Sequence, residues 1–317
     1  MIEVSNADRV VFPEVQRTKG DVVAYYDRIA PRALPHLLQR PLSIRRYPKG
    51  LAGGGFFQKN VPPHYPESIA RFARPRSQAA SKKHRDPKNR EQAVTLYPVL
   101  SQPEHLAYLG NQGAIELHIP TARTSAIDLP DRFIVDLDPP AGALDAVRKA
   151  ARVVRDALAE HGVRSVPIAT GSKGYHVVAP IVPSLPAEQL AITAHKLSTL
   201  LAAQHPELLT ISYRIALRGE RVFLDFLRNN PSASVVAPYS LRASARATVA
   251  TPLAWDELDA CAPDHFAIDD VERLLERPDT LLELARTPAD PRPFAAQVDA
   301  AFERSGLELE HFDRFRS

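Results

Sequence analysis

Apolar positions along the chain predict strands that alternate with amphipathic helices. Residues 132–137 form an apolar run typical of a buried strand, and residues 144–161 place apolar side chains at helical spacing up to a stop signal at Gly162. The segments VRSVPIA and YHVVAPI predict two more strands around the turn TGSKG, and residues 186–203 predict another amphipathic helix. This order predicts an α/β fold with at least one antiparallel hairpin.

The N-terminal part carries a capping signal for a helix. Thr18 is a good N-cap residue with Asp21 three positions later, and the helix is predicted to run to about Leu38. Proline lacks a backbone N–H and disturbs a helix interior, so Pro31 and Pro35 are expected to divide this helix.

Three other segments complete the outline. Residues 51–63 are glycine-rich and then bounded by prolines, which predicts a loop. Residues 71–90 carry eight Lys/Arg and one acid with almost no apolar period, which predicts a flexible basic loop outside the core. Residues 221–227, RVFLDFL, predict a short strand, and the chain from Trp255 onward is predicted to be mostly helical and acidic.

Composition places the chain among globular proteins. It has 317 residues, of which 44% are apolar and 24% are charged. The single cysteine, Cys261, excludes a disulfide framework and a cysteine-based zinc cluster. Because the sequence shows no long apolar run and no signal-peptide pattern, we expect a cytoplasmic protein that has no membrane partner.

The net charge of +3 hides an asymmetry along the chain. Residues 251–317 hold 7 Lys/Arg against 16 Asp/Glu, whereas residues 1–250 hold 33 against 21. A basic body beside an acidic tail favours a polyanionic partner such as nucleic acid. Ordinary surface charge is the alternative.

Two carboxylates lie at the end of the strand in FIVDLDPPAG. Because a strand has a period of two, Asp136 and Asp138 project from one face, and such like charges need a cation between them. Mg²⁺ and Mn²⁺ prefer oxygen ligands of this kind. Asp225, in RVFLDFL, is a third acid, and three carboxylates from two strands can bridge two metal ions about 4 Å apart for phosphoryl transfer. The alternative is a solvated pair, or one paired with arginines.

The turn ATGSKGYHV supplies groups that bind anions. Gly171 and Gly174 permit left-handed backbone, so successive amides can form an anion nest. Hydroxyl, ammonium and imidazole groups come from Thr170, Ser172, Lys173 and His176. The spacing is not that of a Walker A loop, and a plain glycine hairpin is the alternative. Together with the acids and the basic body, the turn favours a nucleoside triphosphate and a nucleic-acid co-substrate.

An ordered set of motifs resembles a known family. FIVDLDPP, ATGSKGYHV and RVFLDF occur in the order found in the polymerase domain of bacterial DNA ligase D, in the archaeo-eukaryotic primase superfamily. NADRVVFP, TKGDVVAYYDRIAP, RPLSIRRYP, FFQKN, AIELHIP, APYSLRA and TPLAWDEL extend the resemblance over roughly residues 3–285. It implies a primase-polymerase domain over residues 1–300 with an RRM-like catalytic core and an N-terminal α/β region packed on it.

The same resemblance implies three segments within the chain. The first is an N-terminal DNA-binding region of about 1–115, which includes a basic loop at 71–92. A catalytic core of about 116–250 and a helical C-terminal region of 251–317 follow.

The resemblance implies metal and nucleotide roles. Asp136, Asp138 and Asp225 match the catalytic carboxylates that hold two divalent ions, Mn²⁺ or Mg²⁺. The residues that match nucleotide-binding positions are Arg45, His118, Thr170, Ser172, Lys173, His176, Arg218 and Arg242. Without the resemblance, His118 would be assigned to the core and Arg45 to ordinary surface charge.

DNA-binding roles are implied in the N-terminal region. Phe56 and Phe57 match an aromatic pair that stacks on the template base. Arg9 and Lys19 match residues that hold a downstream DNA 5′-phosphate. Without the resemblance, the phenylalanines would be core residues and the two cations isolated surface charges.

The chain departs from the family pattern at some positions. Thr170 stands where serine is usual and keeps the hydroxyl, whereas Arg228 replaces a residue that is commonly polar and neutral. This arginine is expected to alter template or nucleotide contacts. The basic loop 71–90 falls in a variable region, so its role in joining ends is open.

The resemblance implies a template-dependent polymerase that adds nucleotides, preferably ribonucleotides, to a primer at short gaps or break ends. No ligase or phosphoesterase module is found in the sequence, so a separate DNA ligase and end-binding or repair proteins are expected as partners. The alternatives are a primase that starts chains, a non-catalytic DNA-end-binding module and, disfavoured by the 170–176 turn, a metal-dependent phosphoesterase.

Overall fold

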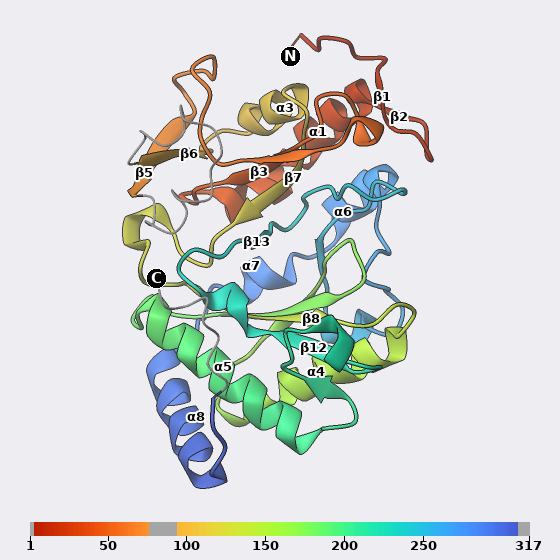
Figure 1. Cartoon of the computed structure of the whole chain (residues 1–317). Helices are drawn as coiled ribbons and strands as arrows, with labels where there is room; N and C mark the ends of the chain where they lie inside the picture. The colour runs from red at the N-terminus through yellow and green to blue at the C-terminus, as the bar shows by residue number, and fades with distance from the viewer. Residues whose placement is uncertain (1–2, 76–93, 310–317) are drawn as a thin grey trace.

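Two β-sheets, each with its own helices, organise the chain (Figure 1). The computed structural model describes residues 3–75 and 94–309. In Figure 1 the N-terminal part lies at the top with a four-stranded sheet, and a six-stranded sheet lies below it. Within these ranges, no helix combines the length and the apolar character that crossing a membrane requires. The predicted α/β class is confirmed.

The larger sheet has the strand order β11-β12-β8-β10-β9-β14. Its neighbours are antiparallel except for β11 and β12, which run parallel. The predicted hairpin is present, since β9 and β10 pair on either side of the turn. The strands of this sheet are β8 (Arg132–Asp138), β9 (Val166–Ala169), β10 (Tyr175–Pro180), β11 (Leu209–Thr210), β12 (Val222–Asp225) and β14 (Thr251–Pro252).

Helices bury their apolar stripes against this sheet. Helix α4 (Leu144–Glu160) packs on β8, β10 and β12, and its predicted stripe is buried. The chain leaves α4 through Gly162, whose φ of +72° favours a residue without a Cβ atom. Helix α5 (Ala187–Gln204) packs on β8 and on α8 (Pro291–Ser305). Both helices contact β8, which fixes the positions of the residues that alternate along it.

The smaller sheet draws strands from distant parts of the chain. Its order is β13-β7-β3-β4, and all its pairs are antiparallel. The strand pairing crosses the segment limits expected near residues 115 and 250, because β13 joins this sheet and β14 joins the larger one. The elements of this part are α1 (Lys19–Leu37), β3 (Ser43–Arg46), β4 (Phe56–Gln58), α3 (Glu104–Asn111), β7 (Ala114–Ile119) and β13 (Val235–Val236).

Helix α1 is unbroken. Its predicted cap is present, since Thr18 Oγ1 accepts from the Asp21 N–H at 3.2 Å and the Asp21 carboxylate accepts from the Thr18 N–H at 2.7 Å. The expectation that Pro31 and Pro35 divide the helix is wrong. The two prolines lie four residues apart, so the donor that Pro35 lacks is the one that would bond to Pro31. Burial of α1 against α3 compensates for the few missing bonds.

Two segments predicted as loops contain strands. Within residues 51–63, β4 follows the 3₁₀ helix η1 (Leu51–Gly53) and pairs with the free edge of β3. The basic segment 71–90 begins in β5 (Ala70–Pro75), which pairs with β6 (Val94–Val99). Residues 76–93 lie outside the described residues. A further pair is formed by β1 (Val10–Phe12) and β2 (Arg17–Thr18).

The strand predicted over residues 221–227 ends early. Strand β12 stops at Asp225, and the chain continues as the 3₁₀ helix η5 (Phe226–Asn229). Asp225 causes this change of geometry, because its Oδ1 accepts from the Leu227 N–H at 3.0 Å and caps η5. The other 3₁₀ helices are η3 (Thr124–Ala126), η4 (Ile215–Leu217), η6 (Trp255–Glu257) and η7 (Ile268–Asp270).

The C-terminal helices tie the two parts of the molecule together. Helix α6 (Val271–Glu276) contacts α1, and α7 (Thr280–Leu284) contacts β9 and β10. The N-cap of α7, Asp279, is buried, and its Oδ2 lies 2.7 Å from His36 Nε2 on α1. The same oxygen accepts from the Tyr239 hydroxyl at 2.9 Å. This buried carboxylate therefore links the C-terminal region to the N-terminal one.

We expect Asp279→Ala to destabilise the protein by about 3–5 kcal/mol, since it leaves buried partners without an acceptor. Urea unfolding monitored by circular dichroism measures this. Asp290→Ala is the matched control, because Asp290 caps α8 at a partly exposed position, where the loss should be much smaller. Equal losses in the two variants would contradict the linking role.

Candidate active site

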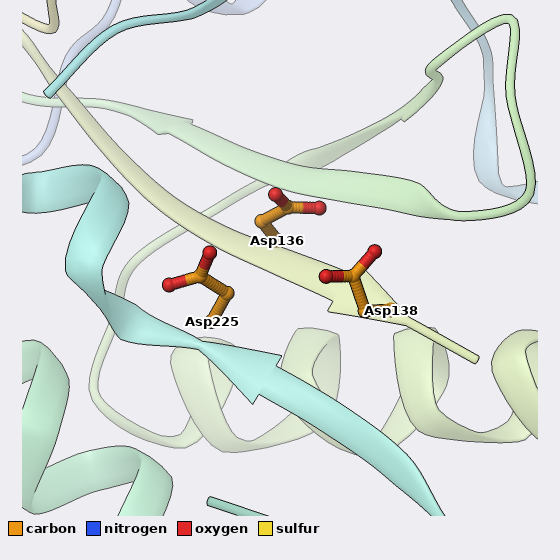
Figure 2. A group of neighbouring side chains, drawn as sticks. All are labelled: Asp136, Asp138 and Asp225. Atoms are coloured by element: carbon orange, nitrogen blue, oxygen red, sulfur yellow. The ribbon is translucent and has the colours of Figure 1, made fainter. Parts of the chain in front are cut away.

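Three carboxylates converge on one face of the larger sheet (Figure 2). Asp136 and Asp138 alternate with core residues along β8, and Asp225 ends the adjacent strand β12. The register pairs Asp225 with Asp136, so the strand pairing itself brings these two side chains together. One ligand atom from each of the three carboxylates lies within 4.8 Å of the others. The structure therefore brings the predicted acids into one group.

The carboxylates open into a cavity of about 160 Å³ that both sheets line. The larger sheet contributes β8, β10 and the turn at residues 170–174, and the smaller sheet contributes His118 on β7 and the strand β13. Arg242, on the segment that follows β13, also faces the cavity. The site therefore depends on the packing of the two sheets.

His176 lies beside Asp136 on the opposite side from Asp225. It pairs with Asp136 in the β10–β8 register, and its Nε2 lies 3.4 Å from Asp136 Oδ1. Burial lowers the pKa of His176 to about 4, so the ring is neutral at neutral pH. Among the described residues, its buried Nδ1 has no hydrogen-bond partner. This nitrogen is therefore an unsatisfied buried polar atom beside the acids.

Arg228 bridges two of the acids. Its Nε donates to Asp136 Oδ2 at 3.0 Å, and its Nη2 lies 3.0 Å from Asp225 Oδ2. Pairing with an arginine was the alternative to metal binding at the sequence level, and the structure contains that pair. Attraction to the carboxylates outweighs burial and raises the pKa of Arg228, so the guanidinium stays charged.

The electrostatics of the acids suit a further cation. Burial raises the pKa of Asp225 to about 6, although the charge of Arg228 opposes the shift. Burial also raises the pKa of Asp138, and repulsion from Asp136 adds to it. A hard divalent ion would relieve both effects, and carboxylate oxygens from two strands are ligands that it accepts. The residues present therefore fit Mg²⁺ or Mn²⁺.

The turn between β9 and β10 is shaped by its two glycines. Gly171 has a φ of +69°, and a Cβ atom at Gly174 would lie 1.9 Å from the Leu137 carbonyl oxygen. Thr170 Oγ1 donates to the Gly174 carbonyl at 2.6 Å, so this hydroxyl holds the turn closed. Lys173 is exposed, with its Nζ 4.0 Å from Asp138 Oδ1. Ser172 also lines the cavity.

Glu116, which the sequence analysis did not select, organises the predicted nucleotide residues. This buried carboxylate lies 3.0 Å from His118 Nε2 and 3.7 Å from Arg45 Nη1. It also accepts from Arg242 Nε at 3.3 Å and from the Ala243 N–H at 3.0 Å. Burial opposes ionisation, but these partners together lower the pKa of Glu116 to about 2. The sequence feature that could have identified Glu116 is an acid within the apolar strand AIELHI, since a buried acid needs polar partners.

The two predicted stacking residues face opposite sides of the edge strand β4. Phe57 pairs with Arg45 and packs edge-on against His118, with ring centroids 5.4 Å apart. Phe56 pairs with Arg46, whose guanidinium lies over its ring. The exposed fraction is 50% for Phe56 and 56% for Phe57. Phe57 therefore lies on the side of β4 that holds the nucleotide residues.

Arg218 and Arg45 are not among the residues that line the cavity. Arg218 lies on the same face of β12 as Asp225, where its guanidinium stacks 3.8 Å from the centroid of the Phe223 ring, and Phe223 pairs with Asp138 in the strand register. Its Nε donates to the Ser212 carbonyl at 3.0 Å. Both arginines stand near the site rather than in it.

A second cavity lies in the N-terminal part. Arg9 and Lys19 line a cavity of about 180 Å³ together with Arg46. Lys19 is buried, and its Nζ donates to the Ser5 carbonyl at 2.6 Å and to Ser5 Oγ at 2.8 Å. Arg9 Nη1 donates to the Pro48 carbonyl at 2.5 Å. The structure thus brings the two predicted 5′-phosphate residues together.

The fold and the site define a protein class. A carboxylate triad beside a glycine turn with cationic donors is typical of metal-dependent phosphoryl transfer. The sequence matches the LigD primase-polymerase domain family over residues 18–281.

Known relatives agree with this class. The chain is 32% identical over 291 residues to the multifunctional non-homologous end joining DNA repair protein LigD of Mycobacterium tuberculosis, a match that covers 89% of this chain and 36% of the relative. The bifunctional non-homologous end joining protein LigD of Bacillus subtilis is 29% identical over 298 residues, covering 91% of this chain and 45% of the relative. The chain spans less than half the length of either relative.

A solved structure matches the whole fold. The polymerase domain from Mycobacterium tuberculosis ligase D in complex with DNA has a TM-score of 0.79 and 29% identity, covering 91% of this chain and 99% of that one. The chain belongs to the LigD primase-polymerase domain family, a family of nucleotidyltransferases. The resemblance and the expected fold are therefore confirmed.

Glu116→Gln should cost up to about 3 kcal/mol of unfolding free energy at neutral pH. The folded-state pKa lies below the ordinary value of 4.5, so this stabilisation is present above about pH 4.5 and is lost as the pH falls towards 2. Urea unfolding of wild type and variant across this range should show a difference that shrinks in acid. Glu188→Gln, at an exposed position of α5, should show no such trend. A pH-independent difference would contradict the prediction.

Proposed function

We propose that this chain is a template-dependent DNA repair polymerase that extends a primer 3′-end at short gaps or double-strand-break ends. The observation that carries the proposal is the convergence of Asp136, Asp138 and Asp225, the first two of which line a cavity together with cationic and hydrogen-bonding groups. The three acids would hold two divalent ions, Mn²⁺ or Mg²⁺. Bound there, such ions lower the pKa of the 3′-hydroxyl and stabilise the charge of the leaving pyrophosphate.

The residues around the acids suit a triphosphate. Lys173 is exposed on the turn, and Arg242 is held in the cavity wall by Glu116, so both can meet anionic oxygens. His176 is neutral and presents an unpartnered Nδ1. Ser172 adds a hydroxyl, whereas Thr170 uses its own hydroxyl to shape the turn.

The remaining nucleotide residues stand at the border of the site. His118 lies in the cavity wall beside Phe57, where a nucleotide sugar would lie, and the proposed preference for ribonucleotides is assigned to this side. Arg45 and Arg218 lie farther out, and their proposed role is to attract the phosphates.

Two features favour gapped DNA as the substrate. Exposed aromatic rings on an edge strand suit stacking on template bases, a contact worth about 1–3 kcal/mol per base that tolerates any sequence. We assign this role to Phe56 and Phe57. The cavity with Arg9 and Lys19 suits a downstream 5′-phosphate, because both cations converge there.

The relatives support a repair setting. The two LigD proteins are named for non-homologous end joining, and the solved domain is in complex with DNA. Gap filling leaves a nick, so the product of this reaction would pass to a DNA ligase. End-binding or repair proteins are the other proposed partners.

The first test is single-nucleotide extension on a gapped DNA with a 5′-phosphate, in Mn²⁺, with ribo- or deoxyribonucleotides. Asp136→Ala and Asp138→Ala should each lower the rate by about 10²–10³-fold, because each removes stabilisation of the transition-state charge. Asp145→Ala is the matched control, since Asp145 is exposed at the start of α4 and should not affect the rate.

Three outcomes would favour a rival. Tight gap binding without addition would indicate a DNA-end-binding module. Synthesis on a template without a primer would indicate a primase, and strand cleavage without addition would indicate a phosphoesterase.

The second test concerns the N-terminal cavity. The variant Arg9→Gln/Lys19→Met should lower the preference for 5′-phosphorylated over unphosphorylated gaps by about tenfold or more, because it removes charge-assisted hydrogen bonds. Binding measured by fluorescence anisotropy reports this ratio. Lys49→Met, which removes an exposed charge nearby, should leave the ratio unchanged. An unchanged ratio in the double variant would place the 5′-phosphate elsewhere.

A further inference from the structure

Arg228 places a positive charge among the carboxylates before any metal binds. It lies three residues after Asp225, and one turn of 3₁₀ helix places such residues on the same side. The guanidinium is shared between Asp225 and Asp136, which come from two different strands. A single positive charge therefore offsets part of the negative charge of the two acids that the sheet register forces together.

The backbone next to Arg228 is anchored by buried hydrogen bonds, whereas the side chain of Arg228 is partly exposed. Asn229 is fully buried, and its Oδ1 accepts from the Ile134 N–H at 3.0 Å while its Nδ2 donates to the Ile134 carbonyl at 2.6 Å. These two hydrogen bonds to the backbone of β8 anchor η5 beside the acids. The side chain of Arg228 is 38% exposed, so it can rotate away from the acids without unfolding η5.

A metal ion and the guanidinium need the same oxygens. Mg²⁺ lies about 2.0–2.1 Å from its ligands, and other divalent ions lie close to this. An ion held by Asp136 and Asp225 would face the positive charge of Arg228 at short range and take the lone pairs to which its N–H groups point. The two cations therefore exclude each other.

We propose that Arg228 is a displaceable counter-ion, which pairs with Asp136 and Asp225 in the metal-free protein and leaves them when a divalent ion binds. The inference rests on the metal site of the proposed function. The released guanidinium stays at the cavity that Lys173 and Arg242 also line. There it can meet a phosphate oxygen, so metal binding and triphosphate binding strengthen each other.

The test measures binding of Mn²⁺ alone, by isothermal titration calorimetry and by electron paramagnetic resonance of the free ion. Arg228→Gln should bind Mn²⁺ about 10- to 100-fold more tightly than wild type, because no charge-assisted hydrogen bonds must be broken first. Without metal, this variant should melt at a lower temperature than wild type, since its acids repel each other. Mn²⁺ should raise its melting temperature more than that of wild type.

Matched variants separate the causes. Arg246→Gln removes the same charge from an exposed arginine that pairs with Asp264, and its Mn²⁺ affinity should equal that of wild type. Equal tightening in both glutamine variants would assign the effect to net charge and overturn the proposal. Arg228→Lys keeps the charge but has one donor group, so its affinity should be intermediate, and it serves if the glutamine variant does not fold.

The remaining outcomes distinguish the inference from the function on which it rests. Mn²⁺ binding of equal strength in wild type and Arg228→Gln, lost in Asp136→Ala, would overturn the counter-ion and leave the metal site in place. Mn²⁺ binding to neither protein would overturn both.

Discussion

The negative charge gathered where β8 meets β12 is the constraint on which the rest of the site depends. Strand register places Asp225 against Asp136, and Asp138 follows on the same face, so their repulsion is built into the fold. The sheet accepts this cost because α4 and the buried residues between the acids fix the strands from the other side. Arg228, His176 and Lys173 are arranged around that charge.

In the smaller sheet the roles of the charges are reversed, because the anion Glu116 lies among cationic side chains. Its single buried carboxylate pairs with two arginines, Arg45 and Arg242, and with one histidine. The guanidinium groups are therefore held on the smaller-sheet side of the site. The acids thus belong to the larger sheet, the Glu116 cluster with its arginines belongs to the smaller sheet, and the cavity lies between the two sheets. This polarity suits a substrate whose anionic part must lie next to, but not against, the carboxylates.

Periodicity predicted the elements that are buried on a defined side. Helix α4 and the β9–β10 hairpin follow the sequence closely, because a shift of register would expose their apolar residues. The same reasoning placed Asp136 and Asp138 on one face, whereas the β8–β12 register brings Asp225 to them. It did not detect the end of β12 at Asp225, since the alternation continues through RVFLDFL and only the capping bond stops the strand. That end places Arg228 beside the acids, which the alternation alone does not predict.

Strand β3 gives the molecule a fixed internal spacing. Arg45 and Arg46 are neighbours, yet one turns towards Glu116 and the other towards the cavity of Arg9 and Lys19. The spacing between the Glu116 cluster and the cavity of Arg9 and Lys19 is therefore set by the pleat of one short strand, which cannot stretch as a loop can. For the proposed polymerase, which would hold a primer end and a downstream phosphate at once, this rigidity would act as a ruler and select one length of gap.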